Sequence, residues 1–402
     1  MSGWPIVALE DVAEIERDIV EASAIKDGTL YVGMENIQSG GDFVGVRTVG
    51  TGDLASSKFA FSPQHLLFGK LRPYLAKVAR PTFSGVCSTD ILPVLPGPKL
   101  DRNYLAQFLL TPAMVSLATS RSTGANLPRL SPRALAELRI PLPHLLEQRR
   151  TADILDKAQA LRAKRRATLS QLDTLTQSIF LGMFGDPSAT CWPMLTVADM
   201  AASAEGAVRT GPFGSQLLHS EFTEGGIAVL GIDNVVENEF RWSERRYISE
   251  AKYRQLARYT VRPDDVLITI MGTCGRCATV PHDIPTAINT KHLCCITLDR
   301  TKCLPVFLHE YFLRHPIARR YLAQRAKGAI MEGLNMGIIK EMPIPKAPID
   351  LQEAFAAKLE AVNGLVRRFR QSDAVLSGLF ESLQDRAFRG ELDSSRPCSA
   401  TA

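Results

Sequence analysis

The sequence predicts an α+β protein in which two globular domains, related by internal duplication, are separated by two long antiparallel helices that form a coiled coil. Three observations predict this fold class. Segments of the first half recur in order in the second half, short β-rich runs punctuated by Gly and Pro begin each half, and each half ends in an apolar heptad pattern. The 402 residues, 45% of them hydrophobic, suffice for two or three domains with separate cores.

The repeat begins at Trp4-Pro5, which recurs as Trp192-Pro193. The later matches keep their order: Asp11 and Ala13 with Asp199 and Ala201, 31–37 with 229–235, 61–68 with 261–268, Ser88-Thr89-Asp90 with Asn289-Thr290-Lys291, Tyr104-Leu105 with Phe307-Leu308, Gly124-Ala125 with Gly328-Ala329, Ile140-Pro141 with Ile344-Pro345, and Leu146-Glu147-Gln148 with Leu351-Gln352-Glu353. Chance similarity of two unrelated domains is the alternative. Collinear matches of several kinds favour duplication, and short loop insertions explain the growing offset.

The pattern divides the chain into six segments. They are a globular domain at 1–146, a long helix at 147–184, a linker at 185–191, a second globular domain at 192–350, a second long helix at 351–390 and a disordered tail at 391–402. Within the domains, the pattern predicts a helical stretch over 104–119 and a strand over 266–270. Gly185-Asp186-Pro187 ends the first long helix, because glycine followed by proline stops a helix.

Each long helix carries one apolar stripe. The stripes run through Ile154, Ala158, Leu161, Thr168, Leu172, Leu175 and Ile179, and through Leu359, Val362, Val366, Phe369, Leu376, Phe380, Leu383 and Ala387. About 35 residues give roughly 50 Å of helix, which is too long to bury against one ordinary domain. We therefore expect the two helices to pair with each other or with a partner protein through Leu161, Leu172, Leu175, Ile179, Val362, Val366, Phe369, Leu376, Phe380 and Leu383. Separate packing of each helix on its own domain is the alternative.

Composition limits the class of protein only loosely. No apolar run approaches the length of a membrane span, and the beginning of the chain turns acidic too early for a secretory signal, so we expect a cytoplasmic protein without a membrane partner. Eight scattered cysteines lack the density of a disulfide scaffold and are expected to be reduced. A net charge of +5 is compatible with a polyanionic partner but is weak support for one.

The second half contains a cysteine-rich stretch that resembles a zinc site. Cys274 and Cys277 are separated by two residues on a turn, with His292, Cys294 and Cys295 downstream. Adjacent residues of a strand point to opposite faces, so Cys294 and Cys295 do not readily serve one tetrahedral ion. Small buried thiols are therefore the favoured reading over zinc, and no metal is expected.

Other motifs do not complete a catalytic site. Residues 209–215 are glycine-rich but lack the Lys-Ser/Thr of a phosphate-binding loop. Pro263-Asp264-Asp265 precedes a β-run, as in many nucleases, but no Glu-x-Lys follows. The chain also has no Gly-x-Ser-x-Gly elbow and no Asn/Asp-Pro-Pro-Tyr/Phe sequence of amino-methylating enzymes. We predict no catalytic residue.

Basic and amide side chains in and near the loops are the remaining candidates. We expect DNA contacts from Lys70, Arg72, Lys77, Arg80, Arg121 and Arg129 in the first half, and from Arg276, Lys291, Arg320, Arg325, Lys327 and Asn335 in the second. Such groups pair with phosphates or with the edges of guanine and adenine. The alternative for each residue is an ordinary solvated surface charge.

Several segments carry a resemblance to a known family. In the second half these are 211–215 (GPFGS), 229–235 (VLGIDNV), 265–268 with 272–276, and 344–345 with 351–353; in the first half they are 140–143 with Glu147-Gln148, and 184–187. In this order the chain resembles the specificity subunit of type I restriction-modification systems over nearly its whole length. The first half departs from the pattern, since 70–74 (KLRPY) replaces the Gly-Thr-x-Gly-Arg stretch. That divergence fits two domains that read different sequences.

The resemblance implies a non-catalytic, DNA-reading subunit. Each globular domain would be a target-recognition domain for one half of an asymmetric bipartite site in double-stranded DNA, and the helix pair would set the gap between the halves. Two methyltransferase subunits binding S-adenosylmethionine would dock largely on the long helices, and restriction/translocase subunits that use ATP and Mg would join them. Adenine methylation would belong to the partner, and this chain would hold no cofactor.

Two other classes of protein remain open. The first is the recognition part of a fused nuclease or methyltransferase, for which purified chain would show cleavage or methyl transfer. The second is a non-enzymatic coiled-coil scaffold whose globular ends bind proteins, for which binding would not depend on DNA sequence.

Overall fold

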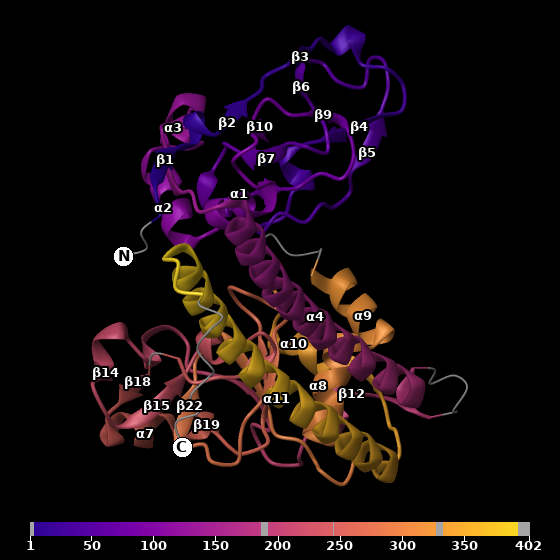
Figure 1. Cartoon of the computed structure of the whole chain (residues 1–402). Helices are drawn as coiled ribbons and strands as arrows, with labels where there is room; N and C mark the ends of the chain where they lie inside the picture. Colours follow the sequence, from indigo (N-terminus) through magenta and orange to yellow (C-terminus); the bar gives the residue numbers. More distant parts are fainter. Residues whose placement is uncertain (1–3, 186–191, 244, 327–332, 393–402) are drawn as a thin grey trace. The chain divides into compact units, whose positions relative to one another are not determined.

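The computed structural model describes residues 4–185, 192–243, 245–326 and 333–392 (Figure 1). It divides into two compact units, which are residues 1–167 with 371–402 (unit 1) and residues 168–370 (unit 2). The unit boundaries fall inside the two long helices, α4 (Leu145–Phe184) and α11 (Ile349–Phe388). Most of the predicted linker at 185–191 and of the predicted tail at 391–402 lies outside the described residues.

Unit 1 contains a five-stranded sheet of order β3-β6-β9-β4-β5, a four-stranded sheet of order β2-β10-β7-β8 and the pair β1-β11. The strands are β1 (Ile6–Ala8), β2 (Ala13–Ile15), β3 (Ile19–Val20), β4 (Thr29–Val32), β5 (Arg47–Val49), β6 (Lys58–Phe61), β7 (Leu66–Gly69), β8 (Val78–Ala79), β9 (Gly85–Cys87), β10 (Ile91–Pro96) and β11 (Arg139–Pro141). The helices beside α4 and α11 are α1 (Arg102–Leu109), α2 (Pro112–Ser120) and α3 (Pro132–Ala136).

The apolar sequence of β7 explains the centre of unit 1. Leu66 and Leu67 are fully buried on opposite faces of the strand, and β10 pairs with it in antiparallel register. The predicted helical stretch over 104–119 is two helices, because Thr111 caps a new helix that starts at Pro112.

Unit 2 has a four-stranded sheet of order β13-β23-β20-β21, a five-stranded sheet of order β14-β18-β15-β22-β19, and the pairs β12-β24 and β16-β17. The strands are β12 (Met194–Thr196), β13 (Val208–Thr210), β14 (Phe222–Thr223), β15 (Ile227–Leu230), β16 (Val235–Val236), β17 (Glu239–Phe240), β18 (Arg246–Ile248), β19 (Thr260–Val261), β20 (Val266–Thr269), β21 (Cys277–Thr279), β22 (Ala287–Asn289), β23 (Leu293–Ile296) and β24 (Pro343–Pro345). The helices are α6 (Val197–Met200), α7 (Glu250–Leu256), α8 (Pro305–Arg314), α9 (Pro316–Ala326) and α10 (Met336–Lys340).

The strand registers confirm the internal duplication. In unit 1, parallel strands β4 and β9 pair Tyr31 with Val86, and in unit 2 parallel strands β15 and β22 pair Val229 with Ile288. The neighbouring antiparallel pairs also agree, since Arg47 lies opposite Tyr31 as Arg246 lies opposite Val229. The predicted match of 31–37 with 229–235 is therefore structural, and the fold class is confirmed.

Two of the sequence matches are shifted by one residue. The Ser88 amide donates to the Val32 carbonyl oxygen (2.9 Å), and the Thr290 amide donates to the Leu230 carbonyl oxygen (2.9 Å). Ser88 therefore corresponds to Thr290 and not to Asn289, as the sequence match had placed it. Insertions in the preceding loops moved the register by one position, which similarity between side chains alone did not reveal.

The second shift lies at the beginning of the long helices. Gln148 accepts from the Asp101 amide (2.8 Å), and Gln352 accepts in the same way from the Leu304 amide (2.8 Å). Both side chains are fully buried, and each donates to two carbonyl oxygens. The equivalent of Gln148 is therefore Gln352, one residue before the predicted match.

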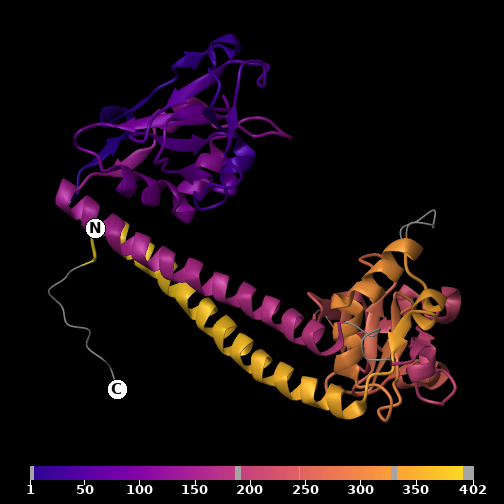
Figure 2. The ribbon, with the colours of Figure 1, turned by 90° about the vertical axis from the view of Figure 1, so that its right-hand side faces the viewer.

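The long helices pair antiparallel within each unit (Figure 2). In unit 1, Leu155 of α4 packs with Phe380 and Ala387 of α11, and the Arg162 Nη2 donates to the Ser377 Oγ (3.3 Å). In unit 2, the rings of Phe180 and Phe355 lie 5.3 Å apart, between centroids. None of the described helices combines the length and the apolarity needed to cross a membrane.

The seam between the helices differs in part from the predicted apolar stripe. Val362 and Phe380 are buried, and Leu172, Ile179, Val366, Phe369, Leu376 and Leu383 are partly buried. Leu161 and Leu175 are instead exposed, at 60% and 45%. Polar neighbours take the inward positions: the Arg162 guanidinium lies 4.6 Å over the Phe380 ring, and the buried Thr176 hydroxyl donates to the Leu172 carbonyl oxygen. A stripe counted from apolar residues alone misses such positions.

Candidate nucleic-acid interface

Two loops of unit 1 bring four predicted basic residues onto neighbouring segments. Leu71 forms an isolated β-bridge with Arg129, and the Arg72 amide donates to the Pro128 carbonyl oxygen (2.7 Å). Lys70 and Arg72 therefore lie beside Arg129, whose guanidinium pairs with the Asp90 carboxylate (3.0 Å). Arg121 ends helix α2 and leads into the same segment. These four residues therefore lie on adjoining backbone segments.

The other two predicted residues of unit 1 hold the structure together. The Lys77 ammonium donates to the Met34 carbonyl oxygen (2.6 Å). The Arg80 guanidinium pairs with Asp156 of α4 (2.7 Å), where each side chain is about one-third exposed. Both contacts fix a loop to another element, so these side chains are already engaged.

In unit 2 the predicted residues that the structure describes lie on four segments. Arg276 ends the β20–β21 loop, and Lys291 lies in the β22–β23 loop, which contacts the first through the Ile270 amide and the His292 carbonyl oxygen (2.9 Å). Arg320 and Arg325 are exposed on α9, and Arg325 lies over the ring of Tyr321. Asn335 caps α10 through the Ile338 amide (2.9 Å), and Lys327 lies outside the described residues.

The end of the parallel strand pair has the same turn in both units. The Gly33 amide donates to the Asn36 side chain (2.8 Å), and the Gly231 amide donates to the Asn234 side chain (2.9 Å). Both asparagines are buried, at 7% and 4% exposure. Each also donates to a carbonyl oxygen further along the chain, so each turn is locked on both sides.

A pocket of about 280 Å³ opens beside this turn in unit 2, and we refer to it as the strand-end pocket. Its lining includes Gly231, Asp233, Arg246, Thr290, Lys291 and His292. The Asp233 carboxylate pairs with the Arg246 guanidinium and accepts from the Ser243 hydroxyl, so Arg246 is held in place at the wall. The pocket therefore combines a fixed cation with the exposed ammonium of Lys291.

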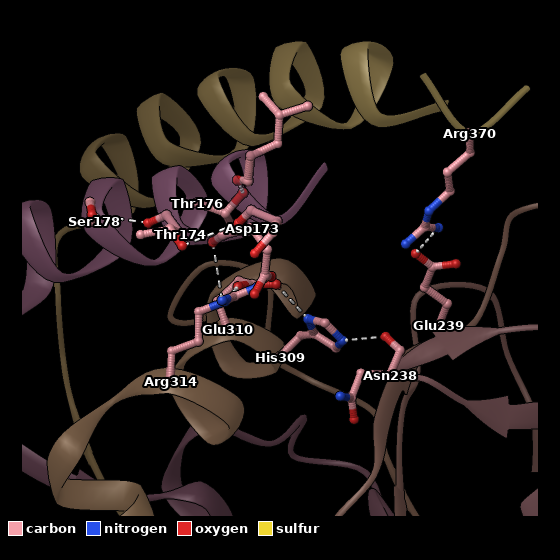
Figure 3. Close-up of polar contacts among 12 residues, drawn as sticks. Asp173, Thr174, Thr176, Ser178, Asn238, Glu239, His309, Glu310, Arg314 and Arg370 are labelled. Carbon is pink, nitrogen blue, oxygen red and sulfur yellow. Dashed lines mark hydrogen bonds and ion pairs between the residues drawn. The ribbon is translucent and has the colours of Figure 1, made fainter. Parts of the chain in front are cut away.

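A chain of charges connects α8 with α4 in unit 2 (Figure 3). The Asp173 carboxylate pairs with the Arg314 guanidinium (2.8 Å), which also pairs with Glu310 (2.5 Å). The other oxygen of Glu310 faces the His309 Nδ1 (2.9 Å). Nearby, Arg370 of α11 pairs with Glu239 (2.7 Å). These pairs line a cavity of about 570 Å³ between the domain and its helix segments.

Comparison with known proteins places this architecture in context. The family model described as type I restriction modification DNA specificity domain matches residues 1–171. The type I restriction enzyme EcoBI specificity subunit of Escherichia coli is 22% identical over 430 aligned positions, covering 97% of this chain and 86% of that protein. This chain is a relative of the type I specificity subunits.

Two further comparisons agree. The EcoDI specificity subunit of Escherichia coli is 28% identical over 196 residues, which are 48% of this chain and 44% of that protein, so this match spans less than half of the relative's length. A solved chain from work on complex assembly and conformational transition of the type I R-M system has a TM-score of 0.61 at 18% identity, covering 97% of this chain and 98% of that chain. The likeness to this solved chain shows a similar fold.

Most cysteines in the described part of this specificity-subunit relative are buried, and Cys274 is partly exposed. Cys277 and Cys294 belong to one apolar core, whereas Cys295 belongs to another, because adjacent strand residues face opposite sides. Burial raises the pKa of the Cys294 thiol to about 12, so this thiol stays protonated. Among the described residues, no three His, Cys, Asp or Glu side chains gather closely enough to hold a metal ion.

The geometry around His309 indicates a charged imidazole. Its Nε2 lies 3.0 Å from the Asn238 carbonyl oxygen and 3.1 Å from that of Cys277, while its Nδ1 faces the Glu310 carboxylate. Burial by itself lowers the pKa of His309, but the hydrogen bond and charge of Glu310, with the two carbonyl oxygens, raise it above the usual value. Both ring nitrogens therefore act as donors.

This arrangement predicts a pH-dependent stability of unit 2. A histidine whose folded-state pKa is raised stabilises fully below its unfolded pKa and loses that contribution as pH rises through the folded pKa. We expect the stability advantage of the natural chain over His309→Gln to be largest below the pKa of an unfolded histidine, about 6.5, and to shrink as pH rises through the raised folded-state pKa. Urea denaturation at several pH values measures it. An advantage that is independent of pH would show that His309 is neutral.

The sequence did not reveal the ion pair between Asp233 and Arg246 in the strand-end pocket, which we call the acid–arginine frame. Asp233 and Arg246 are distant in sequence and meet only through the β15–β18 pairing. A signal was present, because Glu35 and Arg47 occupy the same places relative to β4 in the first half. Only knowledge of the strand register makes that correspondence visible.

Proposed function

We propose that this chain is the DNA sequence-specificity subunit of a type I restriction-modification complex. In this role the two domains read the two unlike halves of a bipartite target, and the chain positions partner subunits that methylate adenine and restrict DNA. The chain itself contributes no catalysis. A cytoplasmic location belongs to the same proposal, because the target is cellular DNA.

One observation carries this proposal. The two domains share strand registers, the buried asparagine turns and the buried glutamines Gln148 and Gln352, but they differ in the loops that surround those turns. Two domains that recognise different half-sites on the same double helix require a common framework and different loops. The DNA backbone is uniform, whereas the base edges of the two half-sites differ. The relatives that bear the name of specificity subunits support the same role.

The test is co-expression with a type I modification subunit encoded beside this chain, followed by mapping of methylated adenines in the host genome. We expect methylation at one asymmetric bipartite motif with a fixed gap. Omission of this chain is the control and is expected to abolish methylation at the motif. Association without sequence dependence would instead favour the scaffold function, and cleavage or methyl transfer by the purified chain would favour the enzyme.

A second prediction concerns the helices. We expect insertion of one heptad into the α4 segment 169–179, matched by one in α11, to change the preferred gap while both half-sites stay the same. The reason is that a heptad preserves the apolar stripe and adds roughly 10 Å of helix. Methylome mapping of the variant measures the gap. An unchanged gap would assign the spacing to the globular domains instead.

A further inference from the structure

The strand-end pocket of unit 2 contains unused hydrogen-bonding capacity. Thr290 lines the pocket, and its buried hydroxyl has no partner among the described residues. The side-chain oxygen of the adjacent Asn289, a fully buried residue, is likewise without a partner within the described part of the chain. Buried polar atoms are normally satisfied, so the unpartnered Thr290 hydroxyl, which lies at the wall of an open pocket, points to a polar ligand.

The charges of the pocket favour an anionic or electron-rich ligand. Lys291 is exposed at its rim, and Arg246 is held at its wall by Asp233. Both cations also lie close enough to lower the pKa of His292, after the larger effect of burial, which favours a neutral imidazole there. Nucleic acid supplies both phosphate oxygens and guanine acceptors for such donors.

Unit 1 has an acid and an arginine at the corresponding backbone positions. Gly33 precedes Glu35 as Gly231 precedes Asp233, and a Cβ on either glycine would collide with the carboxylate two residues later. Each glycine therefore leaves room for an acid that folds back over the turn. Arg47 stands at the strand position of Arg246, so the two units share the backbone positions of the acid and the arginine.

The β9–β10 loop of unit 1 corresponds to the β22–β23 loop of unit 2, and two pairs of backbone hydrogen bonds align these loops. Ser88 and Thr290 correspond, as described above. At the other end, the Lys70 amide donates to the Asp90 carbonyl oxygen (2.9 Å), and the Ile270 amide donates to the His292 carbonyl oxygen (2.9 Å). The residue between these anchors is Thr89 in unit 1 and Lys291 in unit 2. The backbone anchors are thus the same, and this loop residue differs.

We propose that Lys291 is a specificity-determining residue that reads a guanine in the half-site of the second domain, and that Thr89 occupies the same reading position in the first. The inference rests on the proposed function. Residues that support the loop or face the uniform backbone can be common to both domains, whereas residues that face bases must differ when the half-sites differ. A lysine ammonium suits the O6 and N7 acceptors of guanine, and a threonine does not carry that charge.

The experiment uses the full chain in complex with the modification subunit. One DNA duplex carries the motif at which the complex of the natural chain methylates adenine, and the other duplexes carry that motif with one base pair changed at a time. Binding to each duplex is measured for the natural chain and for Lys291→Thr. For the natural chain, we expect a change of one guanine-containing base pair in the second half-site to weaken binding about 10–100-fold. For Lys291→Thr, we expect the same change to have little effect on binding. Preferences in the first half-site should be unchanged.

Two further variants sharpen the test. Lys346→Thr removes the same charge from an exposed position next to β24 in the same unit, and it is expected to keep the natural base preferences. Thr89→Lys is expected to add a preference for guanine in the first half-site. If Lys291→Thr keeps the full base profile of the natural chain, the assignment is wrong while the proposed function stands. If the natural complex shows no sequence preference at all, the proposed function fails with it.

Discussion

Replacing Phe184 with alanine is expected to lower the free energy of unfolding of unit 2 by about 3–5 kcal/mol. The side chain is 1% exposed at the end of α4, and its ring centroid lies 4.8 Å from that of Phe307 and 5.6 Å from that of Phe355. Its removal leaves a cavity among rings that belong to three different helices, which cannot all move inward together. Urea denaturation followed by circular dichroism measures the change.

A matched control is available on the same helix. Leu175→Ala removes an apolar side chain that is 45% exposed, and we expect a change of about 0.5 kcal/mol. A loss below about 1 kcal/mol for Phe184→Ala would mean that the end of α4 does not contribute to the core of unit 2 in solution.

The second large effect is expected from Arg209→Met. Arg209 pairs with Asp265 (2.7 Å), and the two side chains are 11% and 1% exposed. Without the guanidinium, the carboxylate stays buried with neutral donors only, among them the Thr297 hydroxyl (2.6 Å). Breaking one side of a buried ion pair costs about 3–5 kcal/mol. The midpoint of urea unfolding reports it.

The double variant Arg209→Met with Asp265→Asn tests the cause. It leaves no buried charge unpaired, so part of the lost stability should return. Arg133→Ala is the surface control, since its pair with Glu137 involves a side chain that is 89% exposed, and it is expected to leave the midpoint of urea unfolding almost unchanged. If the double variant is as unstable as the sum of the single ones, the pair is not the source of the effect.

The Arg209–Asp265 ion pair also explains one of the motifs considered in the sequence analysis. Pro263-Asp264-Asp265 resembles a nuclease corner, but Asp265 is occupied by Arg209, and Asp264 pairs with Arg300 (2.6 Å). Both carboxylates serve the fold of the domain. Their partners come from distant parts of the sequence, so no local pattern could reveal the pairing.

The fold was more predictable than the interface, for physical reasons. Loop insertions leave the period of the apolar residues and the order of the matching segments unchanged, so the duplication and the two long helices could be inferred. The asparagine turns also fell within a correctly matched segment. The roles of single polar residues depend on distant partners. Arg80 reaches Asp156 on another element, and nothing local to Arg80 indicates this.

The division of the chain has a consequence for the order of its synthesis. The segment 168–370 is continuous, so unit 2 has all its residues before the ribosome reaches the part of α11 that belongs to unit 1. Unit 1 is completed by the second part of α11, which is translated after unit 2, because the Phe388 ring packs against the rings of Tyr104 and Phe108. The domain translated first is therefore the one whose core closes last, and until then its aromatic surface is left to solvent or to a chaperone.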